Sequence, residues 1–400
     1  MEKSLFCFLC FLLLQIGASE AHFSVGGSVS ITFGEVRGAV WIGRGIKHSP
    51  PNPTPSEAKL SRVYTALQSW KSAITDDPNK ILDTWVGSDV CGYRGVFCVD
   101  PQDGLGDQTG PIIAGIDLNH GNLQGTLVKE LSLIKDISLL HLNSNRFTGL
   151  IPHIFKDLPF LIELDLSNNQ LCGPFPIQLL HIPNLIFLDL RFNNFSGPIP
   201  EDIFNKRLDV ILLNHNKFDG QIPLNLGNSP ASVITLANNR FSGNIPFSLA
   251  NVGPRLKEIL FLNNHLTGGI PEGVGLWQDL RVLDVSYNSL SGDLPDSLSC
   301  LGDIEVLNLA HNNFSGKLSD SVCSLGRLEE LTVASNFFSN LDHECGKLSS
   351  RNVHFDFSGN CFPGRNDRQR PEPECSAIAS GGSNSPRVPG ARPIFCSRHS

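Results

Sequence analysis

The sequence has no apolar stretch of the ~20 residues that a membrane-spanning helix needs. An apolar run over residues 5–16 follows Lys3 and precedes the small residues Ser19 and Ala21. This pattern is typical of a secretory signal peptide. We therefore expect residues 1–21 to be a signal peptide, and the mature chain to be secreted with no membrane span.

An excess of basic residues is also missing. The chain has 31 lysines and arginines against 39 acidic residues, which gives a net charge of −8. Because binding to phosphates needs clustered basic side chains, this balance argues against nucleic acid as a partner and favours a basic one. No Gly-x-Ser-x-Gly, phosphate-loop or HExxH motif occurs, and the 12 histidines are scattered. We expect no catalytic residues, no metal site, no cofactor and no enzymatic activity.

The 11 cysteines are not arranged in metal-ligand pairs. Two lie in the expected signal peptide, and the remaining nine should form disulfides in an oxidising compartment. Since nine is odd, one thiol is free or links two chains, so a homodimer is possible. We predict that Cys91 pairs with Cys98, Cys300 with Cys323, and Cys345 with Cys361. Cys172 has no obvious mate, and Cys375 and Cys396 belong to the tail.

One pattern, apolar-x-apolar-x-x-Asn-x-apolar-x-Gly-x-Ile-Pro, recurs from about residue 116 to residue 362. Its asparagine returns every 23 to 25 residues, as at Asn145, Asn169 and Asn193. Eleven coils follow, with a period typical of leucine-rich repeats. In such coils the leucines fill the interior and the asparagine bonds the turning backbone, so the asparagines have a structural role.

The predicted fold is an α/β repeat solenoid, a right-handed superhelix of the plant leucine-rich-repeat type with a concave parallel β-sheet. The Gly-x-Ile-Pro part of each coil resembles the plant-specific repeat type, which implies a second sheet beside the first. Since a stack of coils needs special end units, we expect caps linked by disulfides. The expected order after the signal peptide is a Gly/Pro-rich linker (22–56), an N-terminal cap (57–110), the repeats (111–362) and a Pro/Ser/Gly-rich tail (363–400).

Side chains six, four, two and one before each asparagine should point to solvent from the concave strands, because side chains alternate along a strand. Eight acids stand there, whereas Arg191 is the only lysine or arginine. Apolar side chains accompany the acids in the middle coils, and an exposed apolar patch with an acidic rim indicates a binding site. The alternative is that the acids merely confer solubility and the apolar groups pack against neighbouring coils. The predicted partner-binding residues are Glu163, Asp165, Phe187, Asp189, Phe192, Leu212, Leu260, Asp284 and Tyr287.

Two sequons, Asn194-Phe195-Ser196 and Asn313-Phe314-Ser315, lie just past the asparagine turn. In a secreted chain such triplets are acceptors for N-linked glycans. We expect glycosylation at Asn194 and Asn313.

Four longer segments are more specific than the repeat: YTALQSWKSAITDDPNKILDTWVGSDVCGYRGVFC (64–98), LDLRFN (188–193), GNSPASVITLANN (227–239) and NCFPGRNDRQRPEPEC (360–375). They resemble the leucine-rich-repeat half of the plant leucine-rich repeat extensins. The family's extended Ser-Pro repeats are reduced here to residues 49–51 and 385–386. The resemblance implies a cell-wall protein that binds small basic peptides of the rapid-alkalinization-factor type and regulates wall assembly and growth. Wall polysaccharide or a receptor ectodomain could be a further partner. The alternative function is inhibition of a microbial wall-degrading hydrolase, as in polygalacturonase inhibitors.

Overall fold

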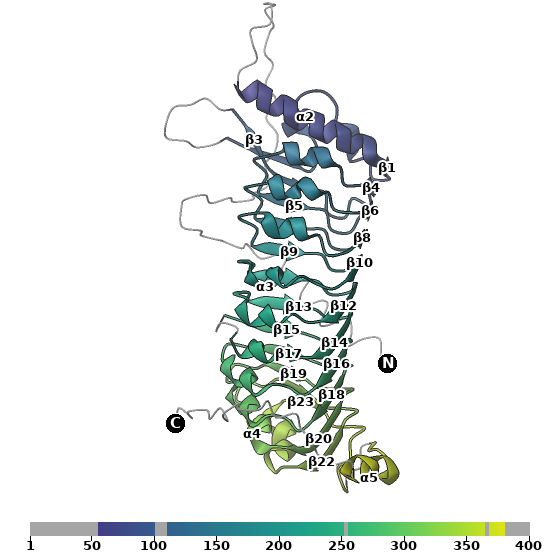
Figure 1. Cartoon of the computed structure of the whole chain (residues 1–400), viewed down its shortest axis with the longest axis vertical. Helices are drawn as coiled ribbons and strands as arrows, with labels where there is room; N and C mark the ends of the chain where they lie inside the picture. The colour runs from purple at the N-terminus through teal and green to yellow at the C-terminus, as the bar shows by residue number, and fades with distance from the viewer. Residues whose placement is uncertain (1–54, 101–109, 252–254, 365–367, 381–400) are drawn as a thin grey trace, which may run out of the picture. The chain divides into compact units, whose positions relative to one another are not determined.

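The computed structural model describes residues 55–100, 110–251, 255–364 and 368–380. The expected signal peptide and nearly all of the expected linker lie outside these residues, as do residues 381–400. The described residues form a solenoid of stacked coils with a sheet along each of two sides (Figure 1). This architecture confirms the predicted leucine-rich-repeat fold.

The N-terminal cap begins with helix α2 (Pro55–Ala73). Its residues Val63, Ala66, Leu67 and Trp70 are buried at helical spacing, so one stripe of the helix covers the apolar edge of the first coil. Two short 3₁₀ helices, η2 (Leu82–Thr84) and η3 (Val90–Gly92), follow. The helix starts two residues before the boundary expected from the sequence, because Pro55 and Ser56 already belong to it.

The concave sheet has twelve strands, eleven of which come one from each coil and run parallel. The remaining strand, β2, pairs antiparallel with β3 and closes the N-terminal edge. The strands are β2 (Val96–Val99), β3 (Ile112–Asp117), β5 (Leu139–His141), β7 (Glu163–Asp165), β9 (Phe187–Asp189), β11 (Val210–Leu212), β13 (Val233–Thr235), β15 (Glu258–Leu260), β17 (Val282–Asp284), β19 (Val306–Asn308), β21 (Glu330–Thr332) and β23 (His354–Asp356).

A second sheet of eleven strands contains the Gly-x-Ile-Pro side of the coils, as predicted. Its edge strand β1 is antiparallel to β4, and the other strands are parallel. They are β1 (Ile74–Asp76), β4 (Gln124–Thr126), β6 (Arg146–Gly149), β8 (Gln170–Gly173), β10 (Asn194–Gly197), β12 (Lys217–Gln221), β14 (Arg240–Asn244), β16 (His265–Gly268), β18 (Ser289–Gly292), β20 (Asn313–Leu318) and β22 (Phe337–Leu341).

Short helices complete the coils on the return path. Because each has at most eight residues, packing against the neighbouring coils, more than helix propensity, holds it in place. They are η4 (Lys129–Leu133), η5 (His153–Asp157), η6 (Ile177–His181), α3 (Asp202–Asn205), η7 (Leu224–Asn228), η8 (Phe247–Asn251), η9 (Glu272–Leu276), η10 (Asp296–Cys300), α4 (Asp320–Cys323) and η11 (Glu344–Arg351).

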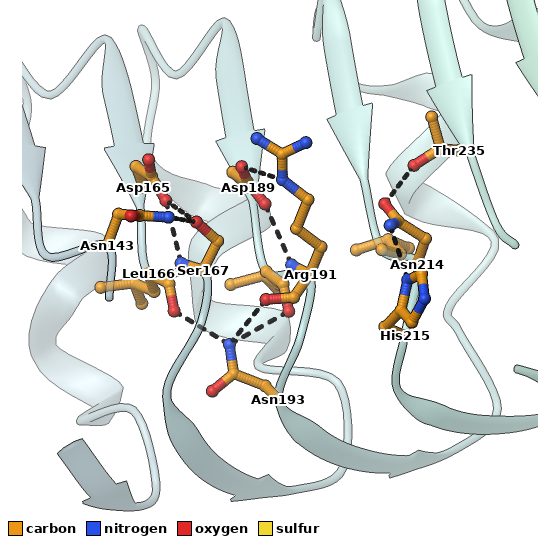
Figure 2. Close-up of polar contacts among 12 residues, drawn as sticks. Asn143, Asp165, Leu166, Ser167, Asp189, Arg191, Asn193, Asn214, His215 and Thr235 are labelled. Carbon is orange, nitrogen blue, oxygen red and sulfur yellow. Dashed lines mark hydrogen bonds and ion pairs between the residues drawn. The ribbon is translucent and has the colours of Figure 1, made fainter. Parts of the chain in front are cut away.

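The repeated asparagines have the structural role predicted for them. Asn193 is buried and donates to the carbonyl oxygens of Leu166 at 2.9 Å and Leu190 at 3.2 Å, while its own oxygen accepts from the N–H of Leu171 at 3.0 Å. One amide thus satisfies backbone groups of two adjacent coils (Figure 2). Buried backbone groups need such partners, so the ladder fixes the turn after each concave strand from β5 to β23.

The disulfides agree with the sequence prediction only in the N-terminal cap, where Cys91 pairs with Cys98. Cys323 pairs with Cys345, and Cys361 pairs with Cys375. Cys300 is disulfide-bonded, but not to Cys323. The predicted pairs Cys300–Cys323 and Cys345–Cys361 are therefore wrong.

The position of each cysteine within its coil explains the correction. Cys323 and Cys345 both lie in the helical part of adjacent coils, whereas Cys361 follows Asn360 at the asparagine turn. Cys361 therefore faces the chain that follows the repeats and bonds Cys375 in helix α5 (Glu372–Ser380). The described part of the expected tail is accordingly a C-terminal cap. Cys172 is unpaired and exposed, in agreement with its lack of an obvious mate.

Candidate ligand-binding face

The parallel register places equivalent residues of successive coils side by side on the concave sheet. Glu163 lies beside Phe187, Asp165 beside Asp189, and Phe187 beside Val210. Seven of the nine predicted partner-binding residues occupy these strands: Glu163, Asp165, Phe187, Asp189, Leu212, Leu260 and Asp284. Phe192 and Tyr287 occupy the turn that follows the strand, where the backbone φ is +53° at each. The fold therefore brings the predicted residues onto one face.

The prediction that all of them point to solvent is wrong for four. Asp189 and Asp284 are 0% and 3% exposed, and Leu212 and Leu260 are also buried. Each lies four residues before the asparagine and is the last residue of its strand, with neighbouring strands about 4.8 Å away. These four residues therefore lie beneath the accessible surface of the face, whereas Asp165 at the equivalent position of β7 is half-buried.

Of the nine predicted residues, the other five are accessible on the face. Glu163, Asp165, Phe187 and Phe192 are half-buried, and Tyr287 is exposed. Acidic groups lie on β7, and the aromatic groups Phe187 and Phe192 follow on the next coil. A cationic group and an apolar group of one ligand could thus bind a single coil apart.

Asp189 and Arg191 form an ion pair on this face. The backbone N–H of Arg191 donates to Asp189 Oδ1 at 3.0 Å, and Arg191 Nε donates to Asp189 Oδ2 at 2.8 Å (Figure 2). Burial, together with the negative charge of Asp165, raises the pKa of Asp189 to about 7, although Arg191 opposes the shift. A carboxyl group that ionises near neutral pH therefore lies under the face.

Asp284 is a second buried carboxyl group, four strands further along the sheet. It accepts hydrogen bonds from the hydroxyl and the N–H of Ser286, at 2.6 and 2.9 Å, and from Asn308 at 3.0 Å. Burial raises its pKa to about 6 against these bonds, which favour the charged form. Its partners are neutral, so it differs from Asp189 in having no cation beside it.

The N-terminal end of the face combines a histidine with carboxylates. His141 lies 3.2 Å from Glu163, measured from Nε2 to Oε2. Burial disfavours its charged form, but the hydrogen bond that His141 donates to Glu163 and the charges of Asp165, Glu163 and Asp117 raise the pKa of His141. Asp165 accepts from the hydroxyl and the N–H of Ser167 at 2.6 and 2.9 Å, so its orientation is fixed.

Two stacked aromatic pairs, which the sequence analysis treated as unrelated residues, lie along the turn row. The rings of Phe192 and His215 are 4.0 Å apart, and those of Tyr287 and His311 are 4.1 Å apart. All four residues stand one before the asparagine in adjacent coils and have positive φ. That shared position is the sequence signal that predicts such pairs. The pairing makes Phe192 and Tyr287 rigid parts of the face.

Family profiles agree with this architecture. One described as the leucine rich repeat N-terminal domain matches residues 64–99, and leucine rich repeat profiles match residues 136–195, 279–301 and 303–325. Leucine-rich repeat extensin-like protein 7 of Arabidopsis thaliana is 56% identical over 239 residues, which are 60% of this chain and 54% of that protein. Protein 2 of the same series is 60% identical over 156 residues, or 39% of this chain and 20% of the relative.

These relatives are leucine-rich repeat extensin-like proteins, and the chain fits that family. It spans about half or less of the length of these curated relatives. Among solved structures, it is similar to the ectodomain of the Arabidopsis receptor kinase HAESA in complex with an extended IDA peptide hormone ligand. The TM-score is 0.64 and the identity 30%, over 76% of this chain and 50% of that ectodomain. This extensin-like chain therefore shares its scaffold with a peptide-binding ectodomain.

Other predicted features of this extensin-like chain remain separate from the face. Asn194 and Asn313 begin strands β10 and β20 of the second sheet, with Asn194 half-buried and Asn313 exposed, and their glycosylation stays a prediction. In the described residues, no helix is long and apolar enough to cross a membrane. The same residues contain no cluster of three or more histidine, cysteine or acidic side chains arranged for a metal ion.

Proposed function

We propose that this chain is a secreted cell-wall protein that binds a small basic peptide on the concave face. The peptide would be of the rapid-alkalinization-factor type, and its capture would regulate wall assembly and growth. The observation that carries the proposal is the adjacency of half-buried carboxylates, Glu163 and Asp165, to half-buried aromatic side chains, Phe187 and Phe192. The similarity to a peptide-bound ectodomain supports it.

The physical roles of the two groups differ. Carboxylates at the rim attract a basic ligand over several ångströms, and this steering mainly accelerates association. Aromatic side chains act after contact by burying apolar surface of the ligand, which mainly slows dissociation. The scaffold keeps both sets in fixed register because each concave strand pairs with the next.

Direct binding measurements test the proposal. The full secreted protein is immobilised, and synthetic basic peptides with their cysteines oxidised are passed over it by biolayer interferometry. We expect saturable binding that weakens when Glu163→Gln and Asp165→Asn are combined. The matched control combines Glu201→Gln and Asp219→Asn, which remove the same charge from exposed residues outside the concave sheet.

An equal loss in both double variants would overturn the concave site. If no basic peptide binds and the protein instead inhibits a microbial polygalacturonase, hydrolase inhibition would replace peptide binding as its function. Wall polysaccharide, a receptor ectodomain and a second copy of the chain remain proposed partners. The exposed thiol of Cys172 would allow a disulfide-linked dimer, which electrophoresis without reductant detects.

A further inference from the structure

The concave face carries one fixed cation among its acids. Of the strand and turn residues that form the face, Arg191 is the only lysine or arginine, and its side chain is 19% exposed. A lone arginine on an acidic binding surface calls for a specific role, because solubility does not require it.

The ion pair with Asp189 uses only part of the guanidinium. Arg191 donates to Asp189 through Nε, and within the described residues neither terminal nitrogen makes a hydrogen bond. Figure 2 shows these two nitrogens directed away from the other labelled side chains. Since Asp189 is 0% exposed and holds Nε at 2.8 Å, the guanidinium is oriented before any ligand arrives.

The surroundings favour a strong interaction with an anion. Phe192, the residue after Arg191, is half-buried and stacks on His215, and Phe187 is half-buried on the strand of the same coil. Burial and the charge of Arg191 lower the pKa of His215, which disfavours a second cation beside Arg191. Apolar neighbours reduce the local dielectric constant and thereby strengthen charge-assisted hydrogen bonds.

We propose that the two terminal nitrogens of Arg191 bind a carboxylate of the peptide ligand, either its C-terminus or an aspartate or glutamate side chain. A planar guanidinium offers two parallel N–H donors that match a carboxylate, whereas an ammonium group does not. This inference rests on the proposed function. It adds that the protein binds the peptide at two points of opposite charge. A cationic group of the peptide lies near Glu163 and Asp165, and a carboxylate of the peptide lies at Arg191.

The buried carboxyl group of Asp189 makes this subsite depend on pH. The charged groups that face it are Asp165 on β7 and Arg191 on its own coil, while β11 places the apolar Leu212 beside it. When Asp189 is ionised, it offsets the charge of Arg191. When Asp189 is protonated, that charge is uncompensated, so carboxylate binding should strengthen as the pH falls from 8 to 6.

Matched peptide libraries test the proposal. Each library contains eight-residue peptides with one fixed lysine and one fixed phenylalanine, and the remaining positions are randomised. One library has free C-terminal carboxylates and the other has carboxamides, so a C-terminal carboxylate can be distinguished from aspartate or glutamate. Wild-type protein should enrich carboxylate-bearing peptides at least about tenfold over sequences without one, a ratio that one charge-assisted bidentate pair can supply.

Three variants sharpen the result. Arg191→Gln and Arg191→Lys should both lose most of this preference, and Asp189→Asn should retain it while removing its increase between pH 8 and 6. Arg240→Gln, at an exposed arginine of the second sheet, is the matched control and should behave as wild type. Circular dichroism melts establish that each variant is folded.

The outcomes separate the two proposals. If wild type enriches lysine-containing peptides but shows no carboxylate preference, or if Arg191→Gln keeps that preference, the Arg191 subsite is refuted and the proposed function stands. If wild type enriches no peptide from either library at any pH, and also fails to bind folded basic peptides, the proposed function itself fails.

Discussion

Asp189 and Arg191 share an ion pair in which the carboxylate is 0% exposed and the guanidinium side chain is 19% exposed. The pair is asymmetric in its contact with solvent. Folding removes the carboxylate from water, while the arginine keeps part of its side chain exposed. This arrangement affects both the stability of the fold and the charge that the concave face presents.

The first prediction concerns stability against pH. The folded pKa of Asp189 is about 7, above the value of 3.8 for a free side chain, so the folded state binds a proton more tightly than the unfolded state. The contribution of Asp189 to the free energy of unfolding is therefore greatest below pH 4, where the group is protonated, and is lost as the pH rises towards 7. Asp189→Asn cannot ionise, so it should gain stability relative to wild type between pH 5 and 8, on the order of 2–4 kcal/mol. Urea unfolding at four pH values measures this difference.

Asp284→Asn provides a comparison for that experiment. The folded pKa of Asp284 is about 6, so the gain in stability from Asp284→Asn should be smaller and complete at a lower pH. A pH-independent difference between wild type and both variants would contradict the prediction. Exposed Asp219→Asn serves as the control and should shift the stability little at any pH.

The location of these acids shows the limit of what the sequence predicts. The asparagine period gives the eleven coils, the two sheets and the face that holds Phe187 and Glu163, because each depends on a pattern within the coil. The burial of Asp189, Leu212 and Leu260 could not be predicted from their position in the coil, since Asp165 at the equivalent position is half-buried. Likewise, cysteine spacing gave the wrong mates for Cys323 and Cys361, because spacing ignores which side of the coil a residue occupies.

The second prediction concerns the N-terminal cap. Replacing Cys91 or Cys98 by Ser should lower stability, because their disulfide fixes the loop that packs beside Trp85 over the first coil. Native disulfides of small secreted domains contribute about 2–5 kcal/mol, and a seven-residue separation should place this one at the lower end. Thermal melts of the variants measure the loss. Peptide mapping that finds both thiols free in the secreted protein would remove the basis of the prediction.

The third prediction concerns the asparagine ladder. Asn216 donates to the carbonyl oxygens of Leu190 and Leu213 and accepts from the N–H of Phe195. Asn216→Ala leaves these buried backbone groups without partners, at about 1–3 kcal/mol for each unsatisfied group. Because water can replace some of these bonds, we expect the free energy of unfolding to fall by at least about 2 kcal/mol. Chemical denaturation measures this loss. Asn225→Ala, at a half-buried position in η7, is the control, and equal losses in the two variants would contradict the role of the ladder.

The last prediction separates steering from anchoring in peptide capture. Because Asp189 and Asp284 are buried, the charges that a ligand meets first on β7 are those of Glu163 and Asp165. Their combined neutralisation to Gln and Asn should slow association several-fold and flatten its dependence on salt, with dissociation little changed.

Phe187→Ala and Phe192→Ala act later on the binding path, because they remove apolar contact that forms after encounter. Dissociation should therefore accelerate, by ten-fold or more if truncation costs about 1.4 kcal/mol or more, while association stays near wild type. Stopped-flow or interferometric rates at low and moderate salt distinguish the two effects. Phe247→Ala, at an exposed phenylalanine in η8, provides the matched control. If both sets of variants keep wild-type rates at both salt concentrations, the ligand does not bind the concave face, and the second sheet and the C-terminal cap become the surfaces to examine.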